Sequence, residues 1–253
     1  MRRSVFRFAF VALLSSIGTA QAQDQLGARM LQERIGDVRP GAYSAGDQLK
    51  FTLTHYLDHY LLRFAGDTET YVLNADHGSL GGRVLKYDSG ATALLVSGWS
   101  AITLYTDQQP SGLPAERTGD AVMPVVVPIS LAEMEQAAGD EATHLAYARG
   151  VHLTFVADWP ALAGNPAMRA FAFDALQNVA RGIDRFAKSA AARTALVARI
   201  GSVQLSAGAR PLVTLRGRIL SVTFNPAQGF SGRASSRAVA NALGELLAVR
   251  TVN

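Results

Sequence analysis

The sequence predicts an α+β protein: an N-terminal antiparallel β-meander, forming a small sheet or a partial barrel, followed by a β-α-β-β-α half. Two patterns support this fold class. From Leu49, apolar and polar residues alternate with a period of two, as in half-buried strands. Beyond residue 121, long segments with apolar residues at helical spacing are separated by short apolar runs. Strands and helices that occupy largely separate stretches of a chain are typical of α+β architecture.

Residues 1–22 have the three-part anatomy of a secretory signal peptide. It consists of three early arginines, an apolar run at 8–17 and a small-x-small site: Arg2, Arg3, Arg7 and Ala20-Gln21-Ala22. We therefore expect cleavage after Ala22 and a periplasmic or secreted mature protein. The general secretory route is favoured, and the adjacent Arg2 and Arg3 leave the twin-arginine route open.

The composition excludes several classes of protein. Loss of the leader lowers Lys+Arg from 24 to 21 against 20 Asp+Glu, so the net charge falls from +4 to +1. No basic run remains, which predicts that the protein does not bind nucleic acid. Cysteine is absent, which excludes disulfides and a cysteine-linked lipid anchor. No later apolar stretch is long enough to span a membrane, so we predict no transmembrane segment after cleavage.

The first part of the mature chain divides at changes of pattern. Residues 23–47 predict an N-terminal helix at 24–35 and then a linker rich in glycine and proline at 38–47. Residues 48–120 predict the β-meander, whose closely spaced short strands are separated by glycine-containing turns. Its end, residues 108–120, contains Pro110, Gly112 and Pro114 and predicts a long polar loop.

Residues 121–253 predict the α+β subdomain, with a soft boundary that leaves one shared core open. Ser130 and Glu133 have the spacing of a capping box, opening a helix that we expect to break at Gly139-Asp140 and end by Gly150. A strand at 151–157 follows. Asn165 and Pro166 then predict the start of the longest helix. Two strands at 200–205 and 212–224 and a helix that opens near Ser235 complete the chain.

The turn at residues 229–236 is the strongest candidate binding site. Glycines ahead of a helix start leave backbone N–H groups open to an anion, and the helix dipole favours negative charge there. The predicted binding residues are Gly229, Gly232, Arg233 and Ser235, and the predicted ligand is a small anion. The alternative is an architectural corner in which Ser235 caps the helix and Arg233 pairs with a local carboxylate. The sequence favours this alternative, because helix caps are far commoner than binding loops.

A second candidate lies at His55 and His59, which are four residues apart and flank Asp58. On a helix, this spacing would suit a metal site. Alternation on both sides instead favours a hairpin with Leu57-Asp58 at its turn. No third ligand has a recognisable spacing, so we predict no metal and no cofactor.

Five aromatic residues fall on predicted strands: Phe64, Tyr71, Tyr87, Trp99 and Tyr105. They are candidates for a groove that holds glycan or peptide. The core of the sheet is the favoured interpretation, because strand aromatics at this spacing usually pack inside.

Three runs of residues carry a family resemblance. They are residues 61–66 (LLRFAG) with 69–73 (ETYVL), residues 102–106 (ITLYT) with 109–115 (QPSGLPA), and residues 229–237 (GFSGRASSR). The chain resembles an uncharacterised family of secreted proteobacterial proteins, a domain of unknown function. The resemblance implies an exported protein and transfers no catalytic residue. This chain has Ala234 where the family's closing turn prefers proline.

Together these patterns favour a non-catalytic periplasmic protein, a binding or envelope-associated module. The expected partner is an unknown envelope protein, a peptide or a small anionic ligand. The alternative is a cofactor-free hydrolase whose acid–base residues lie among His55, His59, Asp58 and Asp158. The sequence contains no complete catalytic constellation, which favours the first hypothesis.

Overall fold

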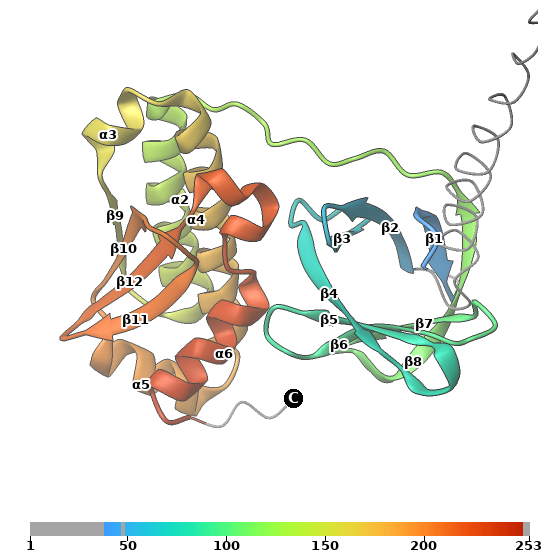
Figure 1. Cartoon of the computed structure of the whole chain (residues 1–253). Coiled ribbons are helices and arrows are strands. Elements are labelled where there is room, and N and C mark those ends of the chain that lie inside the picture. Colours follow the sequence, from blue (N-terminus) through green and yellow to red (C-terminus); the bar gives the residue numbers. More distant parts are fainter. Residues whose placement is uncertain (1–37, 47–48, 250–253) are drawn as a thin grey trace, which may run out of the picture.

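The computed structural model describes residues 38–46 and 49–249. The leader and the predicted helix at 24–35 lie outside these residues. Within them the chain forms two parts side by side, a β-barrel and a helix-covered sheet (Figure 1). The extended segment 120–130 crosses from one part to the other.

The first part is a closed barrel of antiparallel strands in sequential order. The strands are β1 (Gly41–Ala45), β2 (Leu49–Tyr56), β3 (His59–Phe64), β4 (Tyr71–His77), β5 (Arg83–Tyr87), β6 (Thr92–Val96), β7 (Ile102–Thr106) and β8 (Gln109–Gly119). A short 3-10 turn, η1 (Ser79–Gly81), lies between β4 and β5. Closure comes from pairing of β1 with β8, in which Ala45 lies opposite Ala115. The prediction of a small sheet or partial barrel is therefore wrong.

Closure was missed because two segments that the sequence presents as irregular are strands. The predicted linker at 38–47 contains β1, and the predicted polar loop at 108–120 is β8. Most of β8 is exposed, and only Leu113 and Ala115 pack against the barrel core. Its sequence consequently lacks the alternation that marks a half-buried strand. Backbone pairing with β7 and β1, rather than its side chains, holds β8 in place.

Side chains fill the barrel interior, as expected for eight strands. The core combines leucines with a row of aromatic rings in contact. Tyr43 stacks on Phe51 with ring centroids 5.2 Å apart, and Tyr71 meets Tyr87 edge-on at the same centroid distance. Phe64 lies between these pairs, 6.3 Å from the rings of both Phe51 and Tyr71. Of the predicted aromatic set, Tyr71 and Tyr87 are therefore core, whereas Phe64 and Tyr105 are half-buried and Trp99 is 94% exposed.

The second part is a mixed four-stranded sheet packed with helices. Its elements are α2 (Leu131–Arg149), β9 (Thr154–Ala157), α3 (Trp159–Ala163), α4 (Pro166–Phe186), α5 (Ala190–Arg199), β10 (Ser202–Ala207), β11 (Leu212–Arg216), β12 (Ile219–Phe224), η2 (Pro226–Gly232) and α6 (Ser236–Leu246). The strand order is β11-β12-β10-β9, and only β11 runs antiparallel to its neighbour. The molecule is a barrel-containing α+β fold.

Local signals in this part predicted several helix ends. The capping box of Ser130 and Glu133 is present, Gly150 ends α2 with φ of 66°, and Asn165 caps α4. The predicted break at Gly139-Asp140 is wrong, because α2 is continuous there. A single glycine costs a helix only about 1 kcal/mol relative to alanine, and buried contacts on both sides of Gly139 offset that cost.

The topology also determines which barrel loops face the helices. Consecutive hairpins of an antiparallel barrel turn at opposite ends, so the β3–β4, β5–β6 and β7–β8 loops share one end. Glu69, Asp88 and Asp107 lie in these three loops, and each contacts α4 or the start of α6. Among the described residues, no helix combines the length and hydrophobicity that crossing a membrane requires.

Candidate binding cleft

The predicted turn at 229–236 is a tight corner from β12 into α6. Gly229 has φ of 55° and ψ of −129°, a conformation open essentially to glycine alone. At Gly232, a Cβ atom would overlap the carbonyl oxygen of Asn225. Ser235 caps α6 by accepting a hydrogen bond from the backbone N–H of Ala238 at 3.1 Å. The glycines therefore fix the path by which the chain reaches the helix start.

Carboxylates of the barrel occupy this helix start. The backbone N–H and hydroxyl of Ser235 donate to the two carboxylate oxygens of Asp88, at 2.7 and 2.5 Å. Those of Ser236 donate to the two oxygens of Glu69, both at 2.7 Å. The anion that a helix start favours is thus supplied by the protein itself. These four hydrogen bonds fasten the barrel to α6, and we call them the carboxylate clasp.

The two carboxylates of the clasp differ in burial. Glu69 is 2% exposed, whereas Asp88 lies in an exposed turn. Burial raises the pKa of the Glu69 carboxyl, and the hydrogen bonds from Ser236 oppose that rise. Burial likewise raises the pKa of the neighbouring Tyr71 phenol, with Glu69 adding to the effect. Glu69 is therefore the more deeply enclosed half of the clasp.

Arg233 lies inside the protein and is 7% exposed. Its guanidinium donates to the carbonyl oxygen of Phe230 at 3.0 Å, pairs with Asp174 at 3.2 Å and lies 4.9 Å from the Phe230 ring centroid. Burial lowers the pKa of Arg233, and Asp174 opposes that shift. These contacts match the architectural alternative. Of the predicted binding residues Gly229, Gly232, Arg233 and Ser235, none is among the described residues that line the two cavities below, and their binding role stays a prediction.

The predicted histidine pair lies on the β2–β3 hairpin, with Leu57-Asp58 at the turn. The ring of His55 packs edge-on against Tyr60, and Nε2 of His59 lies 3.1 Å from Asp58. Among the described residues, no group of three or more His, Asp or Glu side chains is placed to hold a metal ion. Asp158 caps α3 in the other part of the molecule, so the proposed hydrolase residues do not form one group.

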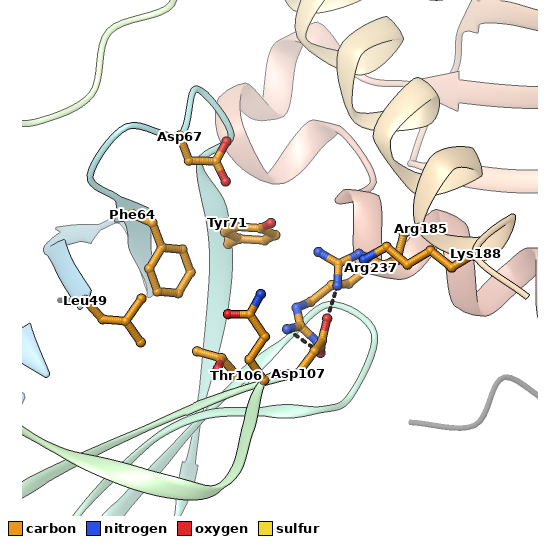
Figure 2. A pocket seen from close by; sticks show the side chains of 10 residues that line it. Leu49, Phe64, Asp67, Tyr71, Thr106, Asp107, Arg185, Lys188 and Arg237 are labelled. Carbon is orange, nitrogen blue, oxygen red and sulfur yellow. Dashed lines mark hydrogen bonds and ion pairs between the residues drawn. The ribbon is translucent and has the colours of Figure 1, made fainter. Parts of the chain in front are cut away.

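A cavity of about 350 Å³ lies between the barrel end and helices α4 and α6 (Figure 2). We call it the cleft. The barrel supplies the apolar and acidic side chains of its lining, and the cations come from α4, α6 and the turn after α4. The lining residues are Leu49, Phe64, Asp67, Tyr71, Thr106, Asp107, Gln108, Arg185, Lys188 and Arg237. A second cavity, of about 590 Å³, is bordered by β1 to β3 and the segment after β8.

Two arginines of the cleft converge on one carboxylate. Asp107 uses Oδ2 for Nη1 of Arg185 and Oδ1 for Nη2 of Arg237, the latter at 2.7 Å (Figure 2). Arg185 comes from α4 and Arg237 from α6. These helices can approach closely because Gly182 has no side chain; a Cβ atom there would press against Val239. We call the Arg185–Arg237 pair the arginine clamp.

The opposite wall of the cleft is apolar. Leu49, Phe64 and Tyr71 form it and continue the aromatic row of the barrel (Figure 2). The row ends at Tyr87, whose ring lies 4.3 Å below the guanidinium carbon of Arg237. Burial raises the pKa of Tyr87 to about 12, so its phenol is neutral at physiological pH. The cleft thus joins a cationic wall to an aromatic wall.

Sequence reasoning missed the clamp. Arg181 and Arg185 are four residues apart, which places them on one face of α4, and Lys188 follows in the turn after that helix ends at Phe186. That basic stripe was the available signal. Arg181 reaches Thr68 of the barrel, which confirms that this face points toward the barrel. Nothing in the local sequence of Asp107 indicates its partners, because it meets α4 and α6 only in the folded molecule.

The fold and the cleft together define a two-part protein in which a barrel is fastened to an α+β layer over a charged cavity. The chain matches the family described as a domain of unknown function, DUF4908, over residues 22–243, and it belongs to that family. This match supports the resemblance noted above in its coarser form, a family of unknown function. A search of curated proteins and a search of solved structures each gave no match.

Proposed function

We propose that the protein is an exported, non-catalytic binding protein that holds a small anionic ligand in the cleft. The observation that carries the proposal is the convergence of Arg185, Lys188 and Arg237 on an open cavity with an aromatic wall. Ligand sites are typically concave, largely apolar and supplied with a few convergent polar groups. The cleft has this character, and its cations select for negative charge.

The balance of charge in the cleft also favours an anion, because its three cations face two carboxylates, Asp67 and Asp107. Two of its cations already share Asp107, and Nζ of Lys188 has no ionic or hydrogen-bonding partner among the described residues. Arginine presents a planar fork that matches carboxylate and phosphate oxygens. An anion with an apolar body would therefore meet donors on the helical wall and ring surfaces on the barrel wall.

A binding role has more support than the hydrolase alternative. His55, His59 and Asp58 lie on one hairpin and Asp158 lies at the start of α3, so they offer no shared site. The described lining of the cleft contains no histidine, and both of its carboxylates have partners: Asp67 accepts the backbone N–H of Glu69, and Asp107 is held by the arginine clamp.

Binding can be tested by titrating the mature protein with decanoate and with decyl phosphate, each an anion with an apolar tail. We expect saturable binding by calorimetry, and we expect Arg185→Gln and Arg237→Gln each to weaken it at least about tenfold, the loss of one charge-assisted hydrogen bond. Arg216→Gln, an exposed arginine on β11, is the matched control and should bind as wild type does. Absence of binding, or equal affinity in all variants, would refute the site.

The export part of the proposal rests on the leader and on the matched region, which begins at residue 22, where the predicted leader ends. We expect protein expressed with its own leader in a Gram-negative host to be recovered from the periplasm beginning at Gln23. N-terminal sequencing of that fraction checks the prediction. Recovery of the intact N-terminus from the cytoplasm alone would count against export.

A further inference from the structure

The arginine clamp is already occupied by a carboxylate. Each oxygen of Asp107 meets a guanidinium from a different helix, so the clamp is spaced for a planar group with two oxygens. Asp107 comes from the barrel, across the cleft from both arginines. The protein thus displays, with one of its own side chains, the kind of group that the clamp accepts.

We propose that the ligand is a carboxylate with an apolar body, and that its carboxylate replaces the Asp107 carboxylate in the arginine clamp. This inference rests on the proposed function and adds to it the chemical class of the ligand and an internal competitor. The ligand oxygens take the positions of the Asp107 oxygens between Arg185 and Arg237. The apolar body then lies along Leu49, Phe64 and Tyr71, the wall that faces the clamp.

Asp107 is well placed to leave the clamp. It lies in the two-residue turn between β7 and β8, and its side chain is 54% exposed. The carboxylate is the exposed partner of these ion pairs, since the side chains of Arg185 and Arg237 are only 29% and 15% exposed. A released Asp107 carboxylate moves into water without leaving a buried group unpaired. Exchange therefore replaces one carboxylate by another in the clamp, and burial of the ligand body favours the exchange.

The size of the cleft limits that body. A cavity of about 350 Å³ is at the small end of the range for small-molecule sites. A medium-length alkyl chain or a single ring suits it better than a long lipid tail. Because the wall is apolar, each methylene that becomes buried should raise affinity about fourfold. Hexanoate, octanoate and decanoate form a series that measures this effect.

The test compares decanoate binding to wild type, Asp107→Asn and Asp107→Ala by calorimetry. Both substitutions remove the competing charge, and Asp107→Asn also keeps the side-chain shape. We expect each variant to bind decanoate about tenfold more tightly than wild type and decan-1-ol no more tightly. Thermal unfolding of both variants should match that of wild type, since Asp107 lies in an exposed turn.

The outcomes separate this inference from the proposed function. If wild type binds decanoate through Arg185 and Arg237 but neither Asp107 variant binds it more tightly, Asp107 does not compete with the ligand. This further inference is then refuted, and the proposed binding function stands. If the Asp107 variants gain affinity for decyl phosphate and not for decanoate, the carboxylate class is refuted. If no variant binds either anion, the cleft is not a ligand site and both proposals fail.

Discussion

Replacement of Glu69 by alanine is expected to lower the free energy of unfolding by about 3 kcal/mol. Glu69 is 2% exposed and accepts both the backbone N–H and the hydroxyl of Ser236, itself 1% exposed. Alanine would leave two buried donors unpaired, and each such group costs roughly 1–3 kcal/mol. Urea denaturation of the mature protein at pH 7 measures the effect.

Two variants act as controls for Glu69→Ala. Glu69→Gln keeps an acceptor for the N–H of Ser236 and should lose about 1 kcal/mol, the typical net value of a hydrogen bond. Asp88→Ala removes the half of the clasp that comes from an exposed turn and should also lose about 1 kcal/mol, because water can enter from that turn to pair with Ser235, itself 4% exposed. Equal losses for Glu69→Ala and Asp88→Ala would show that burial does not set the strength of the clasp.

The pH dependence of the unfolding free energy gives an independent measure of the contribution of Glu69 to stability. Burial raises the pKa of its carboxyl in the folded protein above the ordinary value of 4.5. The folded chain therefore keeps this proton to higher pH than the unfolded chain does. Linkage then requires the contribution of Glu69 to stability to be greatest below about pH 4.5 and to fall as pH rises through the raised pKa. The difference in unfolding free energy between wild type and Glu69→Gln should follow this direction; a difference that grows with pH would contradict it.

Replacement of Arg233 by alanine is expected to cost about 3 kcal/mol, which is the lower end for breaking a buried ion pair. The substitution removes the donor to the Phe230 carbonyl and leaves Asp174 without its cation. The side chain of Asp174 is 30% exposed, so partial hydration keeps the loss from being larger. Arg233→Lys should lose less, because it retains the charge without the fork.

Thermal and urea unfolding of Arg233→Ala, with and without inorganic phosphate, separates the two roles considered for this residue. The exposed Arg216→Ala is the control and should stay within about 0.5 kcal/mol of wild type. We expect no difference between wild type and Arg233→Ala in the effect of phosphate. A variant as stable as wild type that has lost a phosphate-dependent shift would instead restore the predicted ligand role of Arg233.

Several local structures could be predicted from local signals. Ser130, Asn165 and Ser235 were predicted as helix caps and are caps, because a cap depends on residues within one turn. The β2–β3 hairpin with Leu57-Asp58 at its turn followed from alternation on either side. In each case the interactions that determine the structure join residues close in sequence, so the residue pattern of one short segment predicts them.

Closure of the barrel and the cleft depend on contacts between distant segments. The pairing of β1 with β8 joins residues more than sixty positions apart, and β8 has no apolar alternation to reveal it. Asp107 meets Arg185 and Arg237 only after the barrel has docked on α4 and α6. The binding role predicted for the turn at 229–236 stays a prediction, and in the structure the start of α6 holds two anions. Those anions, Glu69 and Asp88, belong to the protein.

The most direct test of the cleft as the binding site is a crystal structure of the mature protein with decanoate at saturating concentration. We expect the decanoate carboxylate to lie between Arg185 and Arg237, with its chain against Phe64 and Tyr71. Decanoate bound away from this cavity, or a cleft left without ligand under conditions in which calorimetry shows binding, would contradict this expectation.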